Sequence, residues 1–167
     1  MDPNQKKIVL RMIPYGLFVL TAEASDGRTS AVTVNWVTQA SFEPPLVGVG
    51  VRKESFIYQV IQAAGHFGLN ILGKGQQNLA FTFFKPAERL GMTLSGEPFH
   101  TGLSGAPIFE TVPAYLDCQL RNVIELGDHS IMVGEVIDAG VNIKLEGRPD
   151  DGILWLKDLG EKIFYGG

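Results

Sequence analysis

Three groups of polar side chains in this chain could do chemistry: two of them together suit a planar ligand that has polar edges and an anionic tail, and the third could supply a reactive group. The first is the basic pair Arg52 and Lys53 with Ser55, which comes just before an apolar run at helical spacing. Free backbone N–H groups, the helix dipole, a hydroxyl and nearby cations favour a phosphate at such a helix start. The same pattern is also typical of an ordinary capped helix whose basic residues are solvated.

The second group is Thr33, Asn35 and Trp36, at the end of a β-branched run. Adjacent strand positions face opposite sides of a sheet, so only one of Asn35 and Trp36 can point into a core. A buried asparagine needs hydrogen-bond partners, and the edge of a heteroaromatic ligand could supply them. Packing is the alternative explanation for the tryptophan.

The third group is the turn Gly127-Asp128-His129, which separates two strong strand patterns. Loops on rigid scaffolds often carry chemistry, and His129 is the best candidate among the histidines for a reactive group. The alternative is a solvent-exposed turn residue beside an aspartate that caps the turn. His66 and His100 have no spaced partner, and one cysteine with three separated histidines predicts no metal site.

Seven or so predicted strands and two or three helices must position these groups. The turn signal at Asp26-Gly27 joins two strands into a hairpin, and tight turns between long neighbouring strands imply antiparallel pairing. A partly closed antiparallel β-barrel is therefore expected rather than a doubly wound sheet. Helices are predicted from the Asp2 cap to about Ile13, from the Ser55 cap to Gly65 and over residues 76–84; strands over 16–22, from Ser30, and over 46–51, 67–72, 114–124, 130–139, 153–156 and 161–165; and an irregular surface segment over 91–107.

Composition narrows the class of protein. A length of 167 residues predicts a single domain over 1–167, and a formal net charge of −4 argues against a nucleic-acid binder. A single cysteine, Cys118, cannot form an internal disulfide, and the first residues lack the apolar core of a secretory signal, so a cytoplasmic location is expected. The apolar runs are too short to span a membrane.

Several segments, in order along the chain, resemble the flavin reductase-like family, whose members have an FMN-binding split barrel. The Gly-Asp-His turn at 127–129 is similar to the family's motif of that sequence. The opening at 13–17 resembles its Pro-x-Gly-Val start, 31–47 its Thr-Ala-Asn-Ser segment followed by Ser-x-x-Pro-Pro-Leu-Val, 53–55 its phosphate-side turn, and 67–72 its Phe-x-x-Asn-x-Leu strand.

The resemblance implies a mainly β, antiparallel Greek-key split barrel that forms a homodimer, holds FMN or less often FAD, and transfers hydride from NAD(P)H to the flavin. It places His129 by the nicotinamide or the flavin face. Trp36 stands where the family usually has serine, and its indole could pack on the flavin or gate access to it. The implied flavin contacts are Thr33, Val34, Asn35 and Trp36 at the ring or ribityl part, Arg52 and Ser55 at the phosphate with Asn70 nearby, and Phe84 and Lys85 at the distal edge.

The sequence is compatible with three functions. The first is an NAD(P)H-dependent flavin reductase that supplies reduced flavin to a partner oxygenase. The second is an FMN-bearing electron-transfer flavoprotein without significant NAD(P)H activity, and the third is a split barrel that has lost flavin.

Overall fold

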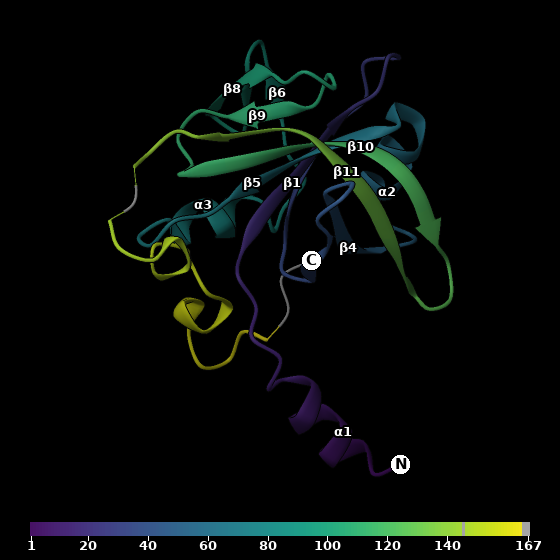
Figure 1. Cartoon of the computed structure of the whole chain (residues 1–167), viewed down its shortest axis with the longest axis vertical. Helices are drawn as coiled ribbons and strands as arrows, with labels where there is room; N and C mark the ends of the chain where they lie inside the picture. Colours follow the sequence, from purple (N-terminus) through teal and green to yellow (C-terminus); the bar gives the residue numbers. More distant parts are fainter. Residues whose placement is uncertain (145, 165–167) are drawn as a thin grey trace.

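The computed structural model describes residues 1–144 and 146–164 and consists mainly of antiparallel strands with three α-helices (Figure 1). The helices are α1 Pro3–Leu10, α2 Phe56–Ala64 and α3 Gln77–Thr82, with short 3-10 helices at Pro149–Asp151 and Leu156–Leu159. The strands are β1 Phe18–Glu23, β2 Thr29–Val34, β3 Val37–Ser41, β4 Leu46–Arg52, β5 His66–Ile71, β6 Arg89–Leu90, β7 Thr93–Leu94, β8 Glu97–Thr101, β9 Pro107–Phe109, β10 Ala114–Ile124 and β11 His129–Val141.

The main sheet has seven strands in the order β2-β1-β5-β10-β11-β4-β3. Its two outer strands, β2 and β3, are joined by only Asn35 and Trp36. A link this short spans about 10 Å, so the sheet must curl until its opposite edges meet. The expected partly closed antiparallel barrel is confirmed, and Asn35 and Trp36 lie at its seam. Two strands were expected between residues 30 and 52, and three are present, since β3 starts as a separate strand after Asn35 and Trp36.

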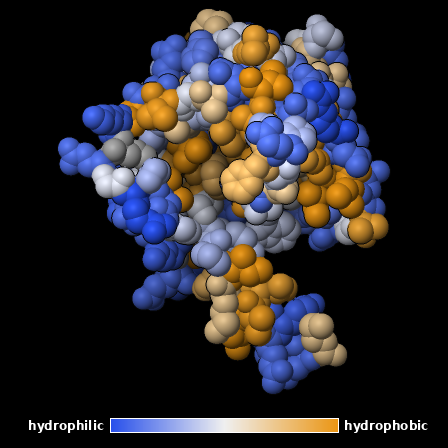
Figure 2. Space-filling model, viewed as in Figure 1, coloured by the Kyte–Doolittle hydropathy of each residue, from blue (hydrophilic) through white to orange (hydrophobic). Residues whose placement is uncertain are grey.

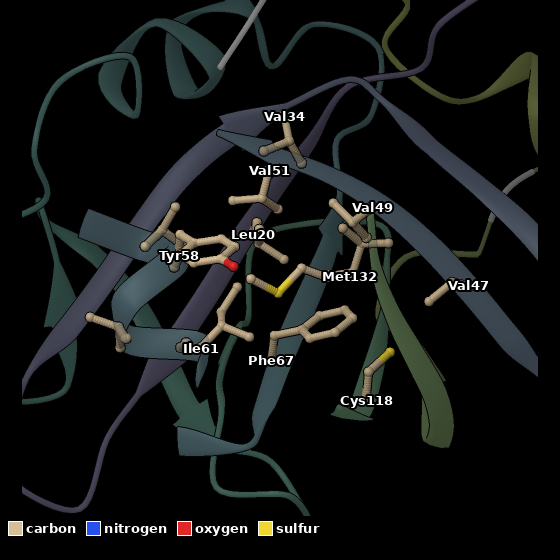
Figure 3. Packing of buried hydrophobic residues seen from close by; sticks show 14 of the residues in the cluster. Leu20, Val34, Val47, Val49, Val51, Tyr58, Ile61, Phe67, Cys118 and Met132 are labelled. Carbon is tan, nitrogen blue, oxygen red and sulfur yellow. The ribbon is translucent and has the colours of Figure 1, made fainter. Parts of the chain in front are cut away.

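The interior of the barrel is filled by apolar residues from the strands and from α2 (Figure 3). Helix α2 runs from its cap Ser55, whose Oγ accepts a hydrogen bond from Tyr58 N at 3.4 Å, to the left-handed Gly65. Both predicted ends of this helix are therefore confirmed. The fully buried members of the cluster include Leu20, Val49, Val60, Ile61, Phe67, Leu69, Cys118 and Met132.

A second apolar cluster lies on the other face of β1, β2 and β5. The prediction of an irregular surface segment over 91–107 is wrong, because β6 to β9 form a four-stranded sheet that contributes residues to this cluster. Leu94, Phe99 and Phe109 from this sheet are at most 2% exposed and pack with residues from α3 and the C-terminal segment. These strands are too short, at two to five residues, for their periodicity to be visible in the sequence.

Two predictions near the chain ends are wrong. Helix α1 ends at Leu10 rather than near Ile13, since residues 11–13 form turns and a bend before Pro14. The expected strands at 153–156 and 161–164 are replaced by isolated bridges at Ile153 and Trp155 and by turns. Position 165, the last residue of the second expected strand, lies outside the described residues.

Helix α1 projects from the barrel, and none of its residues is buried (Figure 1). Figure 2 shows apolar side chains on the part of this projection nearer the barrel and polar ones toward its tip. Among the described residues, no helix is long and apolar enough to cross a membrane.

Gly134 of β11 marks a close approach inside the barrel. A Cβ placed on Gly134 would lie 2.4 Å from Cζ of Phe67, a ring that is 0% exposed and cannot move aside. We expect Gly134→Ala to lower the free energy of unfolding by about 1–3 kcal/mol, measured by urea denaturation. Gly48→Ala is the matched control, because its nearest contact would be an ordinary 3.4 Å; equal losses in both variants would contradict this explanation.

Cys118 is fully buried in β10, as expected for a small apolar residue. Burial, with a smaller effect from the charge of Asp117, raises the pKa of this thiol to about 12. At pH 8 the native thiolate fraction is therefore ~10⁻⁴, and a thiol reagent should modify the urea-unfolded chain quickly and the native chain hardly at all. Because folding raises the pKa of Cys118, the protonated thiol favours the folded state. This contribution to the free energy of unfolding is fully present below the ordinary thiol pKa and is lost as the pH rises toward 12. Rapid native labelling would contradict the burial.

Candidate functional site

A cavity of about 420 Å³ opens between β2, the start of α2 and the segment that follows α3. This volume falls within the usual range for small-ligand sites. Three phenylalanines and aliphatic side chains supply most of the wall, and hydroxyls and one cation supply its polar points. The lining residues are Thr29, Ser30, Val32, Thr33, Phe56, Ile57, Phe83, Phe84, Lys85, Pro86 and Ala87.

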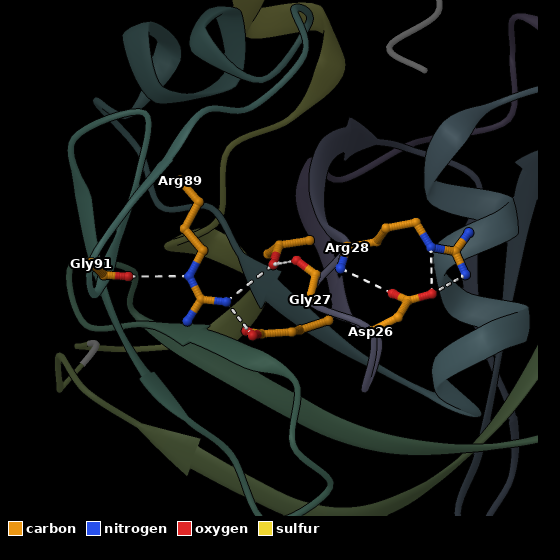
Figure 4. Close-up of polar contacts among 7 residues, drawn as sticks. Asp26, Gly27, Arg28, Arg89 and Gly91 are labelled. Atoms are coloured by element: carbon orange, nitrogen blue, oxygen red, sulfur yellow. Dashed lines mark hydrogen bonds and ion pairs between the residues drawn. The ribbon is translucent and has the colours of Figure 1, made fainter.

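Arg89 fixes the segment after α3 against the β1–β2 hairpin (Figure 4). Its guanidinium donates to Glu23, to Thr29 Oγ1 at 3.2 Å and to the Gly91 carbonyl at 3.2 Å. On the same hairpin, Arg28 Nε donates to Asp26 at 2.8 Å, which lowers the pKa of the Asp26 carboxyl. The cavity therefore has one wall from β2 and another tied to it by Arg89.

A second cavity, of about 300 Å³, is lined by Arg52, Lys53, Glu54, Asp128 and His129. The two cavities are lined by residues from neighbouring positions at the start of α2, since Glu54 lines one cavity and Phe56 the other. Ser55 Oγ donates to Arg52 O at 2.6 Å, which holds the turn closed, and Lys53 N donates to Asp128 O at 3.1 Å, which joins it to the Gly-Asp-His turn. The Arg52 side chain is 61% exposed and pairs with Glu54 at 3.2 Å.

His129 begins β11 directly opposite Arg52 of β4. Its Nδ1 lies 3.0 Å from Asp128 Oδ1, and this hydrogen bond is the main cause of a lowered pKa at the Asp128 carboxyl. A proton on Nδ1 donated to Asp128 fixes the tautomer in which Nε2 is the accepting nitrogen. The imidazole centroid is also 4.7 Å from the Trp36 ring. The structure therefore brings the basic turn, His129 and Trp36 together, although they come from separate parts of the sequence.

Asn35 has an unusual environment at the barrel seam. The residue is 1% exposed, and neither its Nδ2 nor its Oδ1 has a hydrogen-bond partner among the described residues. A buried polar group without a partner costs about 1–3 kcal/mol. Asn35 lines neither cavity, but its unpartnered donor and acceptor pair is suited to a complementary polar edge of a ligand that reaches the seam.

The other predicted contacts are placed differently. Thr33 lines the first cavity, but its hydroxyl donates to Ala80 O at 2.8 Å, and the Val34 side chain points into the barrel core. Asn70 lies apart from both cavities. Its Nδ2 donates to Val19 O and Thr21 Oγ1, each at 3.1 Å, and its Oδ1 accepts from Phe109 N at 2.7 Å. We therefore assign Asn70 a structural role and not a ligand contact.

Phe56 and Phe83 line the cavity and were not among the predicted site residues. Phe56 is the first residue of the apolar run at helical spacing that follows Ser55, yet it is 51% exposed. A signal was present in the sequence, because Ile57, Val60 and Ile61 already form a buried stripe without it. Among the described residues, no group of three or more histidine, cysteine or acidic side chains is placed to hold a metal.

Comparison with known proteins identifies the family of this chain. Residues 10–158 match the model of the flavin reductase like domain. The chain belongs to the flavin reductase-like family. The flavin reductase of Pseudomonas putida is 35% identical over 135 residues, which are 81% of this chain and 78% of that protein. The stachydrine N-demethylase reductase subunit Stc3 of Rhizobium meliloti is also 35% identical over 135 residues, but the chain spans only 57% of its length.

A solved structure supports the same fold. The NADH:FAD oxidoreductase SgcE6 of Streptomyces globisporus superposes with a TM-score of 0.71 at 31% identity, covering 84% of this chain and 86% of that one. The predicted split barrel is therefore confirmed as the fold of this flavin reductase-like chain.

Proposed function

We propose that this protein is an NAD(P)H-dependent flavin reductase that transfers hydride from a reduced nicotinamide to FMN or FAD. The observation that carries the proposal is the aromatic-walled cavity beside the basic start of α2 and His129. Family membership and the names of the relatives, which include a flavin reductase and an NADH:FAD oxidoreductase, support it.

The residues present fit a flavin. The cavity offers phenylalanine walls for a planar ring, and Asn35 offers a buried donor and acceptor without partners among the described residues. Arg52 and the α2 N-terminus suit a phosphate, because α2 has nine residues and a side-chain cap at Ser55. A bound flavin would supply the redox chemistry, since it accepts hydride from a reduced nicotinamide.

The protein's own residues would bind, orient and shield the reactants. In this proposal Phe56 and Phe84 exclude water from the ring site, while Arg52 and the α2 N-terminus that Ser55 caps hold the phosphate. His129, oriented by Asp128, accepts a hydrogen bond at Nε2 from the nicotinamide amide and so positions it. Hydride transfer requires the two reactants to be close together and correctly oriented, so little acid–base catalysis is needed from the protein.

Because these contacts concern the ring, ribityl and first phosphate, we infer that the protein recognises the FMN part common to both flavins. FMN and FAD should then bind with dissociation constants within about tenfold of each other.

A homodimer is also part of the proposal and follows from the family resemblance. Light scattering on the purified protein would give about twice 18.2 kDa, and a monomer mass would exclude it.

The proposal includes a separate acceptor for the reduced flavin, either an oxygenase or an electron-transfer protein. Stc3 is named as the reductase subunit of a demethylase, which supports such a division of labour. An absorbance spectrum of freshly purified protein, followed by titration of flavin fluorescence, tests the binding step. A protein that is colourless and leaves the fluorescence of FMN, FAD and riboflavin unchanged would contradict flavin binding.

Arg52→Gln tests the phosphate end of the site. We expect FMN affinity to fall about three- to tenfold while riboflavin, which has no phosphate, binds as before. The FMN effect should shrink as ionic strength rises, because Arg52 is exposed. Arg121→Gln is the matched control, since Arg121 is 52% exposed and pairs with Glu135 away from both cavities. Equal losses for FMN and riboflavin would remove Arg52 from the phosphate site.

A further inference from the structure

Trp36 packs against β4 at a position where that strand has a glycine, Gly50. The Trp36 carbonyl accepts from Gly50 N at 2.8 Å, so the backbone of Trp36 continues the β3–β4 ladder. The indole lies against Gly50, because a Cβ built on Gly50 would be 3.1 Å from both Cβ and Cε3 of Trp36. Gly50 therefore forms a seat for the indole, and a side chain at this position would displace it by a few tenths of an ångström.

The seated indole contacts the imidazole of His129. Their centroids are 4.7 Å apart with planes inclined at 57°, which is a tilted ring contact of the favourable kind. His129 is held on its other side by Asp128, through the hydrogen bond at Nδ1. The imidazole is thus fixed by a carboxylate and by an aromatic wall, while its own side chain is 15% exposed.

We propose that Trp36 is a positioning residue, seated on Gly50, that fixes the His129 imidazole for the reduced nicotinamide. The inference rests on the proposed function, because it assigns His129 to the nicotinamide side. Trp36 then acts through His129 on nicotinamide binding and has little influence on flavin affinity. A serine at this position could not make this contact, so the role requires an aromatic residue here.

The test compares four variants: Trp36→Ser, Trp36→Phe, Gly50→Ala and the control Gly48→Ala. Gly48 lies on the same strand and face as Gly50, but its added Cβ would make ordinary contacts of 3.4 Å with Ile131 and 3.7 Å with Thr38. Steady-state oxidation of NADH and NADPH with free FMN gives KM and kcat, and fluorescence titration gives the flavin Kd. Trp36→Ser is also made in His129→Ala.

We expect Trp36→Ser to raise the KM for the reduced nicotinamide about tenfold and Gly50→Ala to raise it by a smaller factor, with the flavin Kd within about twofold of wild type in both. Trp36→Phe should recover most of the loss, Gly48→Ala should match wild type, and Trp36→Ser should add nothing in the His129→Ala background. An undiminished effect in that background, or a change confined to the flavin Kd, would overturn the proposal.

The contact itself is tested without turnover by proton NMR of the flavin-free protein. The indole ring current should shift the His129 ring protons, assigned with His129→Ala, and the shift should be lost in Trp36→Ser and reduced in Gly50→Ala but not in Gly48→Ala. An unchanged resonance in both Trp36→Ser and Gly50→Ala would overturn the seat. If the shift behaves as expected while wild type oxidises neither NADH nor NADPH, the proposed function fails and with it the nicotinamide role.

Discussion

Asn35→Leu should stabilise the flavin-free protein and at the same time weaken flavin binding by about 10- to 100-fold. Both amide atoms of Asn35 are buried without partners among the described residues, so the folded protein carries a desolvation cost there. Leucine has a similar size and removes that cost, worth about 1–3 kcal/mol per group. The same change deletes two hydrogen bonds to the ligand, which accounts for the loss of affinity. Urea denaturation and fluorescence titration with riboflavin measure the two effects.

Asn70→Leu is the matched control, because Asn70 is also buried but all its bonds are made. There the same substitution leaves the buried Phe109 N–H without its partner and should destabilise the protein by about 1–3 kcal/mol. Opposite signs for Asn35 and Asn70 would support a ligand-directed role for Asn35. Comparable destabilisation in both variants would show that Asn35 has a structural partner, such as water or a second copy of the chain.

His129→Ala should lower NAD(P)H oxidation about 100-fold and leave flavin affinity within about twofold of wild type. His129 lines the cavity beside Arg52 and is held by Asp128 and Trp36, so its removal affects the nicotinamide side and not the aromatic cavity. His129→Gln should retain part of the activity, because glutamine can still hydrogen-bond the nicotinamide amide.

The control for His129 is His100→Ala, since His100 is exposed on β8 and contacts Tyr115 at a centroid distance of 6.0 Å. It lines neither cavity, so its loss should not change the rate. Unchanged turnover in His129→Ala would exclude His129 from the site. A parallel loss of flavin binding would instead place it at the flavin.

Local signals in the sequence identified most of the regular elements. The caps Asp2 and Ser55, the Asp26-Gly27 turn and the alternation along residues 114–124 each have a physical cause within a few residues, and the structure has the corresponding elements. The strand β3 and the small sheet β6 to β9 were missed, because strands of two to five residues give no readable period.

Local sequence patterns could not predict contacts between residues that are far apart in the chain. The sequence shows Asn35 and Asn70 as two similar polar interruptions, and only the fold reveals that one is fully bonded and the other is not. The closure of the barrel at Asn35 and Trp36 also depends on strand order, which pairing of distant segments determines. The contact of Trp36 with His129 follows from that closure.

The most direct test of the central claim is oxidation of NADH and NADPH, followed at 340 nm, by the purified protein with FMN or FAD and with neither added. We expect a rate that depends on the flavin, is proportional to protein concentration, and falls about 100-fold in His129→Ala at saturating flavin. Flavin bound as judged by its spectrum, with nucleotide oxidation no faster than with free flavin alone, would contradict it and would favour an electron-transfer flavoprotein.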